Sequence, residues 1–418
     1  MSLTDKNIVV IGGGISGMSV AVESAEVGYP VILVEREPYL GGRIARMNQY
    51  FPKLCPPYCG MEINFKRIKA NPRIEVYTQT ELTNVSGSGG NYAVTLAKKP
   101  RFVNDNCTAC GECAKVCPVE RPSNFDYGMS KTKAIYLPHP MAYPHWYVID
   151  PSVCKGKECG KCVEACKYKA INLDDKAETI DVPAGAIVLA TGWKPYDAAK
   201  MDNLGFGKYK NVITNVMMER LASVNGPTEG KILRISDGKE AKRVVFVQCA
   251  GSRDENHLPF CSAVCCLASL KQATYVRQQY PDSSVKIFYI DIRAGGRLET
   301  FYSKVAADEG IKLVKGKVAK IVEKPDGTLT VTAEDTLTGN KIEEEADLVV
   351  LATGMEPESI NPKAIAGIDV DQYGFILPSG SILSAGCSKK PMDVASSVQD
   401  ATGVALKAIQ SVRGGSNG

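Results

Sequence analysis

The stretch Asn7-Ile-Val-Val-Ile11-Gly12-Gly-Gly14-Ile-Ser-Gly17 decides the fold of this chain. Its apolar residues predict a buried strand, and its glycines form the pattern G-x-G-x-x-G at the start of a helix that runs to about Val27. Residues 31–34 predict a second strand that closes on Glu35. Such a βαβ unit binds a dinucleotide pyrophosphate at the helix N-terminus, and its acidic residue bonds the ribose. The alternative is a glycine-rich turn that has no ligand.

The dinucleotide is either NAD or FAD. Arg36 follows the acidic residue, and a second glycine pair, Gly41-Gly42, precedes Arg43. This arrangement resembles the flavoproteins with two dinucleotide-binding domains, which include thioredoxin reductase. In that family the N-terminal fold holds FAD. The resemblance implies FAD here, with Arg36, Gly42 and Arg43 beside it.

Eight cysteines form two arms typical of iron–sulfur proteins. The first is Cys107-x2-Cys110-x2-Cys113-x3-Cys117-Pro, and the second is Cys154-x4-Cys159-x2-Cys162-x3-Cys166, whose four-residue first gap is unusual. In two-cluster ferredoxins the last cysteine of each arm ligates the other cluster. We therefore assign one [4Fe–4S] cluster to Cys107, Cys110, Cys113 and Cys166, and a second to Cys154, Cys159, Cys162 and Cys117. Disulfides and structural zinc are the alternatives.

The composition is that of a soluble globular protein. The chain has 418 residues, of which 44% are hydrophobic and 23% charged, and its net charge is +4. This length predicts about two or three domains, and this charge favours neither nucleic acid nor a basic membrane anchor. No apolar run reaches the roughly 18 residues of a membrane span. Fifteen cysteines without an export signal predict a cytoplasmic protein with reduced thiols.

Two copies of Ala-Thr-Gly, at Ala190-Thr191-Gly192 and at 352–354, each follow an apolar strand and predict a duplicated α/β plan. A strand at 91–96, a turn, a strand at 178–182 and then a buried strand at 186–189 predict a meander with the ferredoxin arms inserted at its hairpin. The predicted domains are 1–97 (FAD-binding, first part), 98–175 (two-cluster insert), 176–240 (FAD-binding, second part, and connector), 241–346 (second Rossmann-like domain) and 347–418 (FAD-binding, C-terminal part).

The second domain lacks a glycine loop. After the strand at 242–247 the chain reads Gln248-Cys249-Ala250-Gly251, and Cys261, Cys265 and Cys266 follow. Without the glycines a backbone cannot approach a pyrophosphate closely, which argues against NAD(P)H. The four thiols are either buried structural cysteines or ligands of a third [4Fe–4S] cluster. Two further thiols, Cys55 and Cys59, are left open between a redox role and a structural one.

The C-terminal segment is similar to the part of the same flavoproteins that returns to the FAD domain. It has small residues at Ala385-Gly386, then Asp393, and closes in a helix. The resemblance implies that Gly386 and Asp393 lie at the flavin and that the Asp393 carboxylate meets the ribityl chain.

Residues 249–253, 261–266 and 289–297, together with the inserted arms, resemble the HdrA family, the flavoproteins of heterodisulfide reductase. The likeness is greatest to its shorter QmoA branch, from the quinone-interacting membrane-bound oxidoreductase complex. The resemblance implies a thioredoxin-reductase-like α/β flavoprotein with a two-cluster ferredoxin insert. It also implies a third cluster at Cys249, Cys261, Cys265 and Cys266.

The same resemblance implies a relay between menaquinol and adenylylsulfate reductase in dissimilatory sulfate reduction, with flavin-based confurcation or bifurcation. Its implied partners are a QmoB-like homologous subunit and a QmoC-like membrane haem/iron–sulfur subunit, which place it peripherally at the inner face of the cytoplasmic membrane. The alternatives are a soluble flavoprotein of the heterodisulfide reductase type, an NAD(P)H-dependent flavin disulfide oxidoreductase and a scaffold with degenerate sites. No side chain is predicted to be catalytic.

Overall fold

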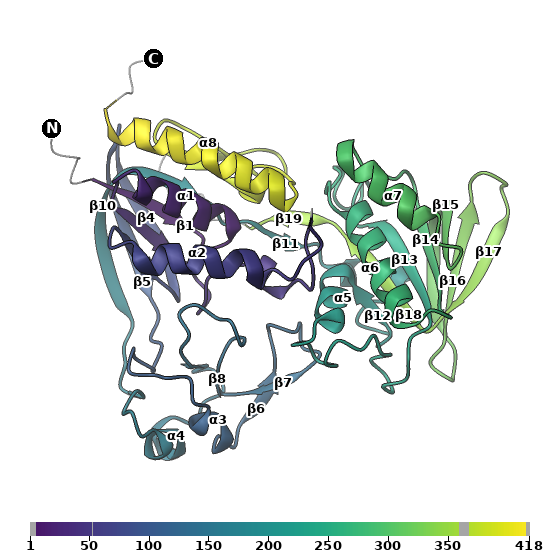
Figure 1. The fold of residues 1–418 in the computed structure, drawn as a ribbon, viewed down its shortest axis with the longest axis horizontal. Helices are drawn as coiled ribbons and strands as arrows, with labels where there is room; N and C mark the ends of the chain where they lie inside the picture. Colours follow the sequence, from purple (N-terminus) through teal and green to yellow (C-terminus); the bar gives the residue numbers. More distant parts are fainter. Residues whose placement is uncertain (1–5, 52, 359–367, 415–418) are drawn as a thin grey trace.

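The computed structural model describes residues 6–51, 53–358 and 368–414. It contains two α/β domains, each built on a seven-stranded sheet. A smaller cysteine-rich module lies below the first domain in Figure 1.

The first sheet joins strands from both ends of the chain. In spatial order it contains β3 (Ile74–Tyr77), β2 (Val31–Val34), β1 (Asn7–Ile11), β10 (Glu178–Leu189), β5 (Asn91–Lys98) and β4 (Thr80–Ser88), and β22 (Ile382–Ser384) pairs with β10. Strands β1, β2, β3 and β22 run parallel to their neighbours, and α1 (Ile15–Glu26) and α2 (Tyr58–Ala70) form the crossovers from β1 to β2 and from β2 to β3. Strands β4, β5 and the first half of β10 form an antiparallel meander.

Strand β10 corrects one prediction. The sequence predicted two separate strands, at 178–182 and 186–189, but the structure has one 12-residue strand through Pro183. The strand continues because both halves find hydrogen-bonding partners. Residues 178–184 pair with β5, and the second half pairs with β1 and β22.

Three helices cover one face of the first sheet: α1 (Ile15–Glu26), α2 (Tyr58–Ala70) and α8 (Val394–Val412). Figure 1 shows α8 lying along α1, so the C-terminal helix packs against the first helix of the chain. The apolar core beneath them includes Ile8, Leu33 and Val188, which are fully buried. Burying such side chains contributes about 1.5–3 kcal/mol each.

The cysteine-rich module is inserted between β5 and β10. Lys98 at the end of β5 pairs with Glu178 at the start of β10, so the module leaves and re-enters the sheet at one point. Its short elements are α3 (Glu112–Lys115), β6 (Glu120–Pro122), β7 (Lys131–Lys133), β8 (Ile135–Tyr136), β9 (Val148–Ile149) and α4 (Lys161–Ala165). A small core of Val103, Ile135 and Ile149 packs together with the thiols of both arms.

The second sheet has the order β12 (Val212–Thr214), β18 (Leu348–Thr353), β13 (Arg243–Ala250), β14 (Ser284–Tyr289), β15 (Ile311–Glu323), β16 (Leu329–Asp335) and β17 (Lys341–Ala346). Its helices are α5 (Asn215–Ala222), α6 (Cys265–Gln279) and α7 (Glu299–Ala306). The sequence boundaries placed residues 212–214 in the second part of the FAD-binding domain and its connector, and residues 348–353 in the C-terminal part of that domain. They lie in the second sheet instead, because β18 pairs in parallel with both β12 and β13.

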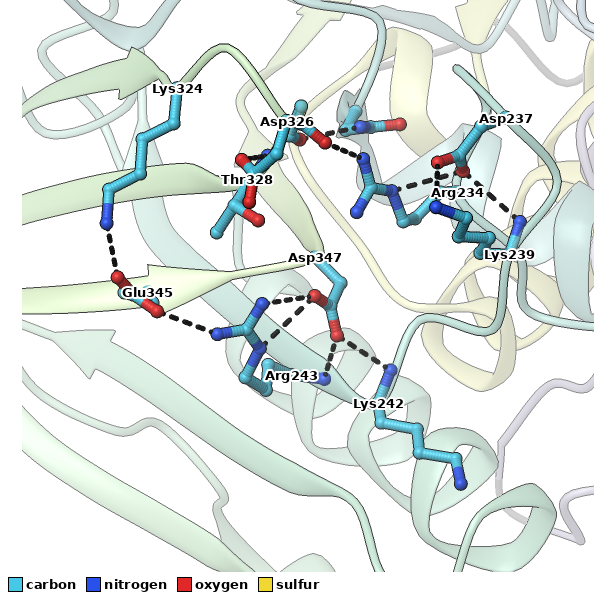
Figure 2. A network of polar contacts seen from close by, with 12 residues as sticks. Arg234, Asp237, Lys239, Lys242, Arg243, Lys324, Asp326, Thr328, Glu345 and Asp347 are labelled. Carbon is cyan, nitrogen blue, oxygen red and sulfur yellow. Dashed lines mark hydrogen bonds and ion pairs between the residues drawn. The ribbon is translucent and has the colours of Figure 1, made fainter.

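A polar network connects the starts of β13 and β18 with the end of β17. Figure 2 shows the Arg243 guanidinium between Asp347 and Glu345, at 2.7 and 2.8 Å. The Asp347 carboxylate also accepts hydrogen bonds from the backbone N–H groups of Lys242 and Arg243. The network lies at the opposite end of β13 from Cys249, so its role is to stabilise the domain.

A two-stranded antiparallel ribbon joins the domains. It pairs β11 (Trp193–Pro195) with β19 (Met355–Pro357), where the chain crosses between the two domains. A small hairpin of β20 (Asp369–Val370) and β21 (Ile376–Leu377) precedes β22. Among the residues that the structure describes, every helix is too short or too polar to cross a lipid bilayer.

Candidate functional site

A large cavity lies between the two domains and collects most of the predicted FAD-binding residues. Ten of the twelve line it: Gly12, Gly14, Glu35, Arg36, Gly42, Arg43, Ala190, Thr191, Gly192 and Asp393. The other two, Gly17 and Gly386, do not line it. The cavity continues into the second domain along α5 and α6, where Asn215, Glu219 and Lys271 form part of its wall.

The glycines of the first turn have separate roles. Gly12 has a φ of +112°, and an added Cβ there would lie 2.3 Å from the carbonyl oxygen of Ala190. A Cβ on Gly17 would lie 1.8 Å from the carbonyl oxygen of Gly12, so this glycine allows α1 to pack against the turn. A Cβ on Gly14 would meet no protein atom within 4 Å. Gly14 therefore keeps open the space at the helix N-terminus, which fits a pyrophosphate.

The Glu35 carboxylate is held by two backbone donors. It accepts hydrogen bonds from the N–H of Gly13 at 2.7 Å and from the N–H of Glu37 at 2.8 Å. Burial raises the pKa of Glu35 to about 7, although these hydrogen bonds oppose the shift. Each carboxylate oxygen has a further lone pair, which fits the hydroxyls of a ribose.

Two arginines lie at the cavity wall beside the interdomain ribbon. The Arg36 guanidinium pairs with Glu358 at 3.0 Å, which holds the pKa of that carboxyl below its usual range against the effect of burial. Arg43 donates to the carbonyl of Trp193 and lies 4.9 Å from the centre of its ring. Burial lowers the pKa of Arg43. Both arginines thus connect the FAD domain at the cavity wall to the ribbon of β11 and β19, through which the chain passes between the domains.

Asp393 is the N-cap of α8. One carboxylate oxygen accepts a hydrogen bond from the Ser396 N–H at 2.7 Å, which leaves the other free to face the cavity. Gly386 has a φ of +64°, and an added Cβ would lie 2.1 Å from the Ser16 hydroxyl. Gly386 therefore allows the segment before α8 to pack on α1, and it does not itself face the cavity.

Sequence reasoning missed the polar cluster at the deep end of the cavity. Lys271 and Glu219 form an ion pair 2.9 Å long, and their side chains are only 5% and 7% exposed. Glu219 also accepts from the Gln272 amide at 2.7 Å and from the Tyr275 hydroxyl at 3.3 Å. The Gln272 carbonyl oxygen is buried without a partner among the described residues. These residues come from α5 and from the middle of α6, so no local motif connects them.

The first set of thiols surrounds one small cavity. Cys107, Cys110, Cys113 and Cys166 all line it, which is the interleaved grouping that the two arms predict. Burial and then the charge of Cys107 raise the pKa of Cys113 to about 12. The N–H of Ala170 points to the Cys166 sulfur at 3.3 Å. The donor set fits a [4Fe–4S] cluster, which thiolates hold.

Three of the remaining four arm cysteines, Cys117, Cys154 and Cys162, pack against the same small core as Cys107 and Cys166. Burial, followed by the charges of Cys154 and Cys117, raises the pKa of Cys162, so these three thiols are neighbours. Gly156 and Gly160 have positive φ angles, and the N–H of Gly156 points to the Cys154 sulfur at 3.4 Å. Backbone N–H groups directed at sulfur stabilise the reduced form of a cluster.

The third set lies at the start of α6. Burial and then the charges of Cys249, Cys266 and Cys261 raise the pKa of Cys265, so the other three thiols of the set lie near Cys265. Two backbone positions of the loops are left-handed, namely Cys249 and Ala263. The Cys265 and Cys266 thiols also donate weakly to backbone carbonyls, as structural cysteines do. Ala263 and Val264, between the ligand positions, line the large cavity.

None of the fifteen cysteines forms a disulfide. Among the described residues, no three histidine, cysteine or carboxylate groups converge closely enough to hold one metal ion. Cys55 lies in the loop before α2 and Cys59 in its first turn, where Cys59 is exposed. Neither belongs to the three sets of four.

Two family models match the chain. An FAD-dependent oxidoreductase model matches residues 7–97, and a 4Fe–4S binding domain model matches residues 100–120. The chain is 39% identical to the A-type subunit of the ferredoxin/F420H2-dependent CoB–CoM heterodisulfide reductase of Methanosarcina acetivorans, over 98% of this chain and 53% of that protein. It is 37% identical to the A-type subunit of the H2:CoB–CoM heterodisulfide, ferredoxin reductase of Methanothermobacter thermautotrophicus, over 98% of this chain and 64% of that protein. It spans about half to two thirds of the length of these relatives.

Solved structures show the same fold. The thioredoxin reductase of T. acidophilum aligns with a TM-score of 0.54 at 15% identity, over 97% of this chain and 99% of that one. The thioredoxin reductase of Lactococcus lactis aligns with a TM-score of 0.54 at 14% identity, over 98% and 99% of the two chains. The predicted fold class is therefore confirmed. The chain has the fold of thioredoxin reductase, a first segment that matches FAD-dependent oxidoreductases and an insert that matches 4Fe–4S binding domains, and over nearly its whole length it is similar to the A subunits of CoB–CoM heterodisulfide reductases.

Proposed function

We propose that this chain is the electron-transfer subunit of a heterodisulfide-reductase-type complex, with FAD in the large cavity and [4Fe–4S] clusters at the three thiol sets. One observation carries the proposal. Ala263 and Val264, from the loop that supplies Cys261 and Cys265, line the same cavity as Gly12 and Gly14. Electrons are able to pass between the flavin and that thiol set without crossing a folded layer of protein.

FAD, when bound, accepts two electrons together and passes them on singly to one-electron carriers. The chain's own residues bind and orient it. Gly14 admits the pyrophosphate, Glu35 receives the ribose hydroxyls, and Asp393 faces the ribityl chain. Met355, Met392 and Cys387 form a buried apolar cluster against Trp193 and Val264, which excludes water from that end of the cavity.

The second domain does not support NAD(P)H as the electron donor. Where a glycine loop would cradle a pyrophosphate, β13 ends in Cys249-Ala250, and the thiol set occupies that position. We therefore propose one-electron carriers of the ferredoxin type as the partners. Rapid oxidation of NADH or NADPH by the purified protein would contradict this part of the proposal.

The prediction of a menaquinol-to-adenylylsulfate-reductase relay, with QmoB-like and QmoC-like subunits, is a second and narrower proposal. It is supported by the motifs at 249–253 and 289–297, whereas the relatives' names support the heterodisulfide reductase type. Anaerobic co-purification with mass spectrometry separates the two. A membrane haem protein and adenylylsulfate reductase would support the narrower reading, and a heterodisulfide-cleaving partner would support the first.

The cofactor content tests the main proposal. Protein purified without oxygen should contain one FAD and about twelve irons per chain, since each [4Fe–4S] cluster holds four. Cys265→Ser should lower the iron content by about a third, whereas Cys59→Ser, at an exposed thiol outside the three sets, should leave it unchanged. Zinc in place of iron, or equal iron in the Cys265→Ser protein, would contradict the assignment.

A further inference from the structure

Arg101 links the cysteine-rich insert to the FAD domain. Its guanidinium donates to the backbone carbonyls of Trp146 and Tyr147 in the insert, at 2.9 and 3.2 Å. It also donates to the carbonyl of Pro38 at 2.8 Å and to the Thr78 hydroxyl at 3.3 Å, both in the FAD domain. The planar fork of arginine suits this arrangement, because one side chain makes hydrogen bonds to both partners at once.

On each side of Arg101, the residues that it contacts lie next to a proposed cofactor site. Tyr147 lines the small cavity of the first thiol set, and its hydroxyl lies 3.3 Å from where a Cβ on Gly111 would be. On the other side, Pro38 precedes Tyr39, which lines the large cavity. Arg101 therefore lies on a short path of hydrogen bonds and covalent bonds that joins the first thiol set to the dinucleotide cavity.

The positive charge of Arg101 has no carboxylate partner. Its four acceptors are neutral, and within the described part of the chain no Asp or Glu lies at ion-pair distance from it. Burial lowers the pKa of Arg101 to about 10, while the charges of Tyr136 and Cys107 raise it, so the group remains a cation at neutral pH. Asp175 is close, but its carboxylate accepts from the backbone N–H groups of Arg101 and Phe102.

Arg121 in the same insert is a natural contrast. It is 8% exposed and its guanidinium lies 4.4 Å from the centre of the Tyr136 ring. It differs from Arg101 in being paired with Asp150 at 3.1 Å, which compensates its charge. The insert thus holds one neutralised arginine and one whose charge is free to act on its surroundings.

We propose that Arg101 is a positioning residue that fixes the first iron–sulfur cluster relative to the FAD cavity, and that its unpaired charge raises the reduction potential of that cluster. The inference rests on the proposed function, because it requires the cluster at Cys107, Cys110, Cys113 and Cys166. The electrostatic reason is that reduction adds one negative charge to the cluster. A nearby cation stabilises the reduced state more than the oxidised state, and low dielectric strengthens the effect.

The test is an anaerobic redox titration of the full chain, monitored by electron paramagnetic resonance. Arg101→Gln should shift the midpoint potential of one of the two insert clusters to a lower value. Arg101→Lys keeps the charge but loses the fork, so its potential should stay close to the native one while electron exchange between flavin and cluster slows. Arg121→Gln serves as the control and should shift the same potential less than Arg101→Gln does.

A second pair of variants avoids removing the arginine. Thr78→Glu places a carboxylate where the Thr78 hydroxyl now accepts from Arg101, and should lower the same potential by pairing the charge. Thr78→Gln is the neutral control of equal size and should not. This pair decides the electrostatic claim even if Arg101→Gln fails to fold.

The failure of this inference is distinguishable from failure of the proposed function. If the native protein shows no iron–sulfur signal, the proposed function is wrong. If the signals are present but Thr78→Glu and Thr78→Gln titrate alike, the role of the Arg101 charge is wrong and the cluster assignment stands. Equal shifts in Arg101→Lys and Arg101→Gln would also overturn it, because the charge would then not be the cause.

Discussion

The burial of the ion pair between Lys271 and Glu219 predicts how a substitution of Glu219 changes the free energy of unfolding. Removing one partner of a buried ion pair leaves an uncompensated charge and costs about 3–5 kcal/mol. Glu219→Gln should therefore lower the unfolding free energy by about 3 kcal/mol. The double variant Glu219→Gln/Lys271→Met, which removes both charges, should recover most of the loss. The measurement is chemical denaturation.

Glu62→Gln is the control for this prediction, because it breaks an exposed pair with Lys66. It should leave the denaturation midpoint unchanged. A double variant as unstable as Glu219→Gln alone would show that the loss comes from packing and not from the unpaired lysine.

Glu35 predicts how stability depends on pH. Its pKa rises from 4.5 to about 7 in the folded chain, because burial disfavours the charged form. Between these values the folded state binds more protons than the unfolded state, so the contribution of Glu35 to stability falls as the pH rises from about 4.5 to about 7. Glu35→Gln should flatten this part of the pH profile, measured by denaturation of the flavin-free protein. A native profile that rises through this window and does not change in the variant would contradict the assignment.

At the scale of elements, two glycines of the first βαβ unit should have different roles: Gly14 in FAD binding and Gly17 in folding. Gly14→Ala adds a Cβ that meets no protein atom, so the chain should fold normally but lose at least about tenfold in FAD affinity, or about 1.4 kcal/mol. Gly17→Ala places its Cβ 1.8 Å from a backbone oxygen and should disrupt the turn itself. Flavin fluorescence titration measures the affinity.

Gly403→Ala in α8 is the matched control for the glycine variants. An added Cβ there also meets no atom within 4 Å, and the position does not line the cavity. It should stabilise the helix by about 0.5–1 kcal/mol and leave FAD affinity unchanged. Normal FAD binding by Gly14→Ala would show that the pyrophosphate does not approach this turn.

Elements that form from contiguous residues were predictable. The spacing of apolar residues and glycines between Asn7 and Glu35 specifies strand, turn, helix and strand with few alternatives, and the structure has them. The continuity of β10 was not predictable, because Pro183 and Gly185 signal a turn locally. Its partners β1, β5 and β22 are distant in sequence and impose an extended strand there.

At the scale of the whole molecule, the spacing of the cysteines predicted which thiols group together, but no sequence pattern predicted the cavity that both domains line. The arms of a ferredoxin pattern carry their own pairing rule, and the structure places Cys166 with Cys107, Cys110 and Cys113 accordingly. The cavity wall formed by Glu219 and Lys271, and the Arg101 link, depend on how separate segments dock. No local pattern records such contacts, because they join distant segments of the chain, as the contact between Arg101 and Trp146 does across 45 positions.

The central claim is that one flavin and three clusters exchange electrons within this chain. An anaerobic reductive titration of the purified protein tests it most directly, by counting the electrons that each chain accepts. We expect about five, two for FAD and one for each [4Fe–4S] cluster, and about four for Cys265→Ser. Uptake of only two electrons by the native chain, with bleaching confined to the flavin absorption, would contradict the account.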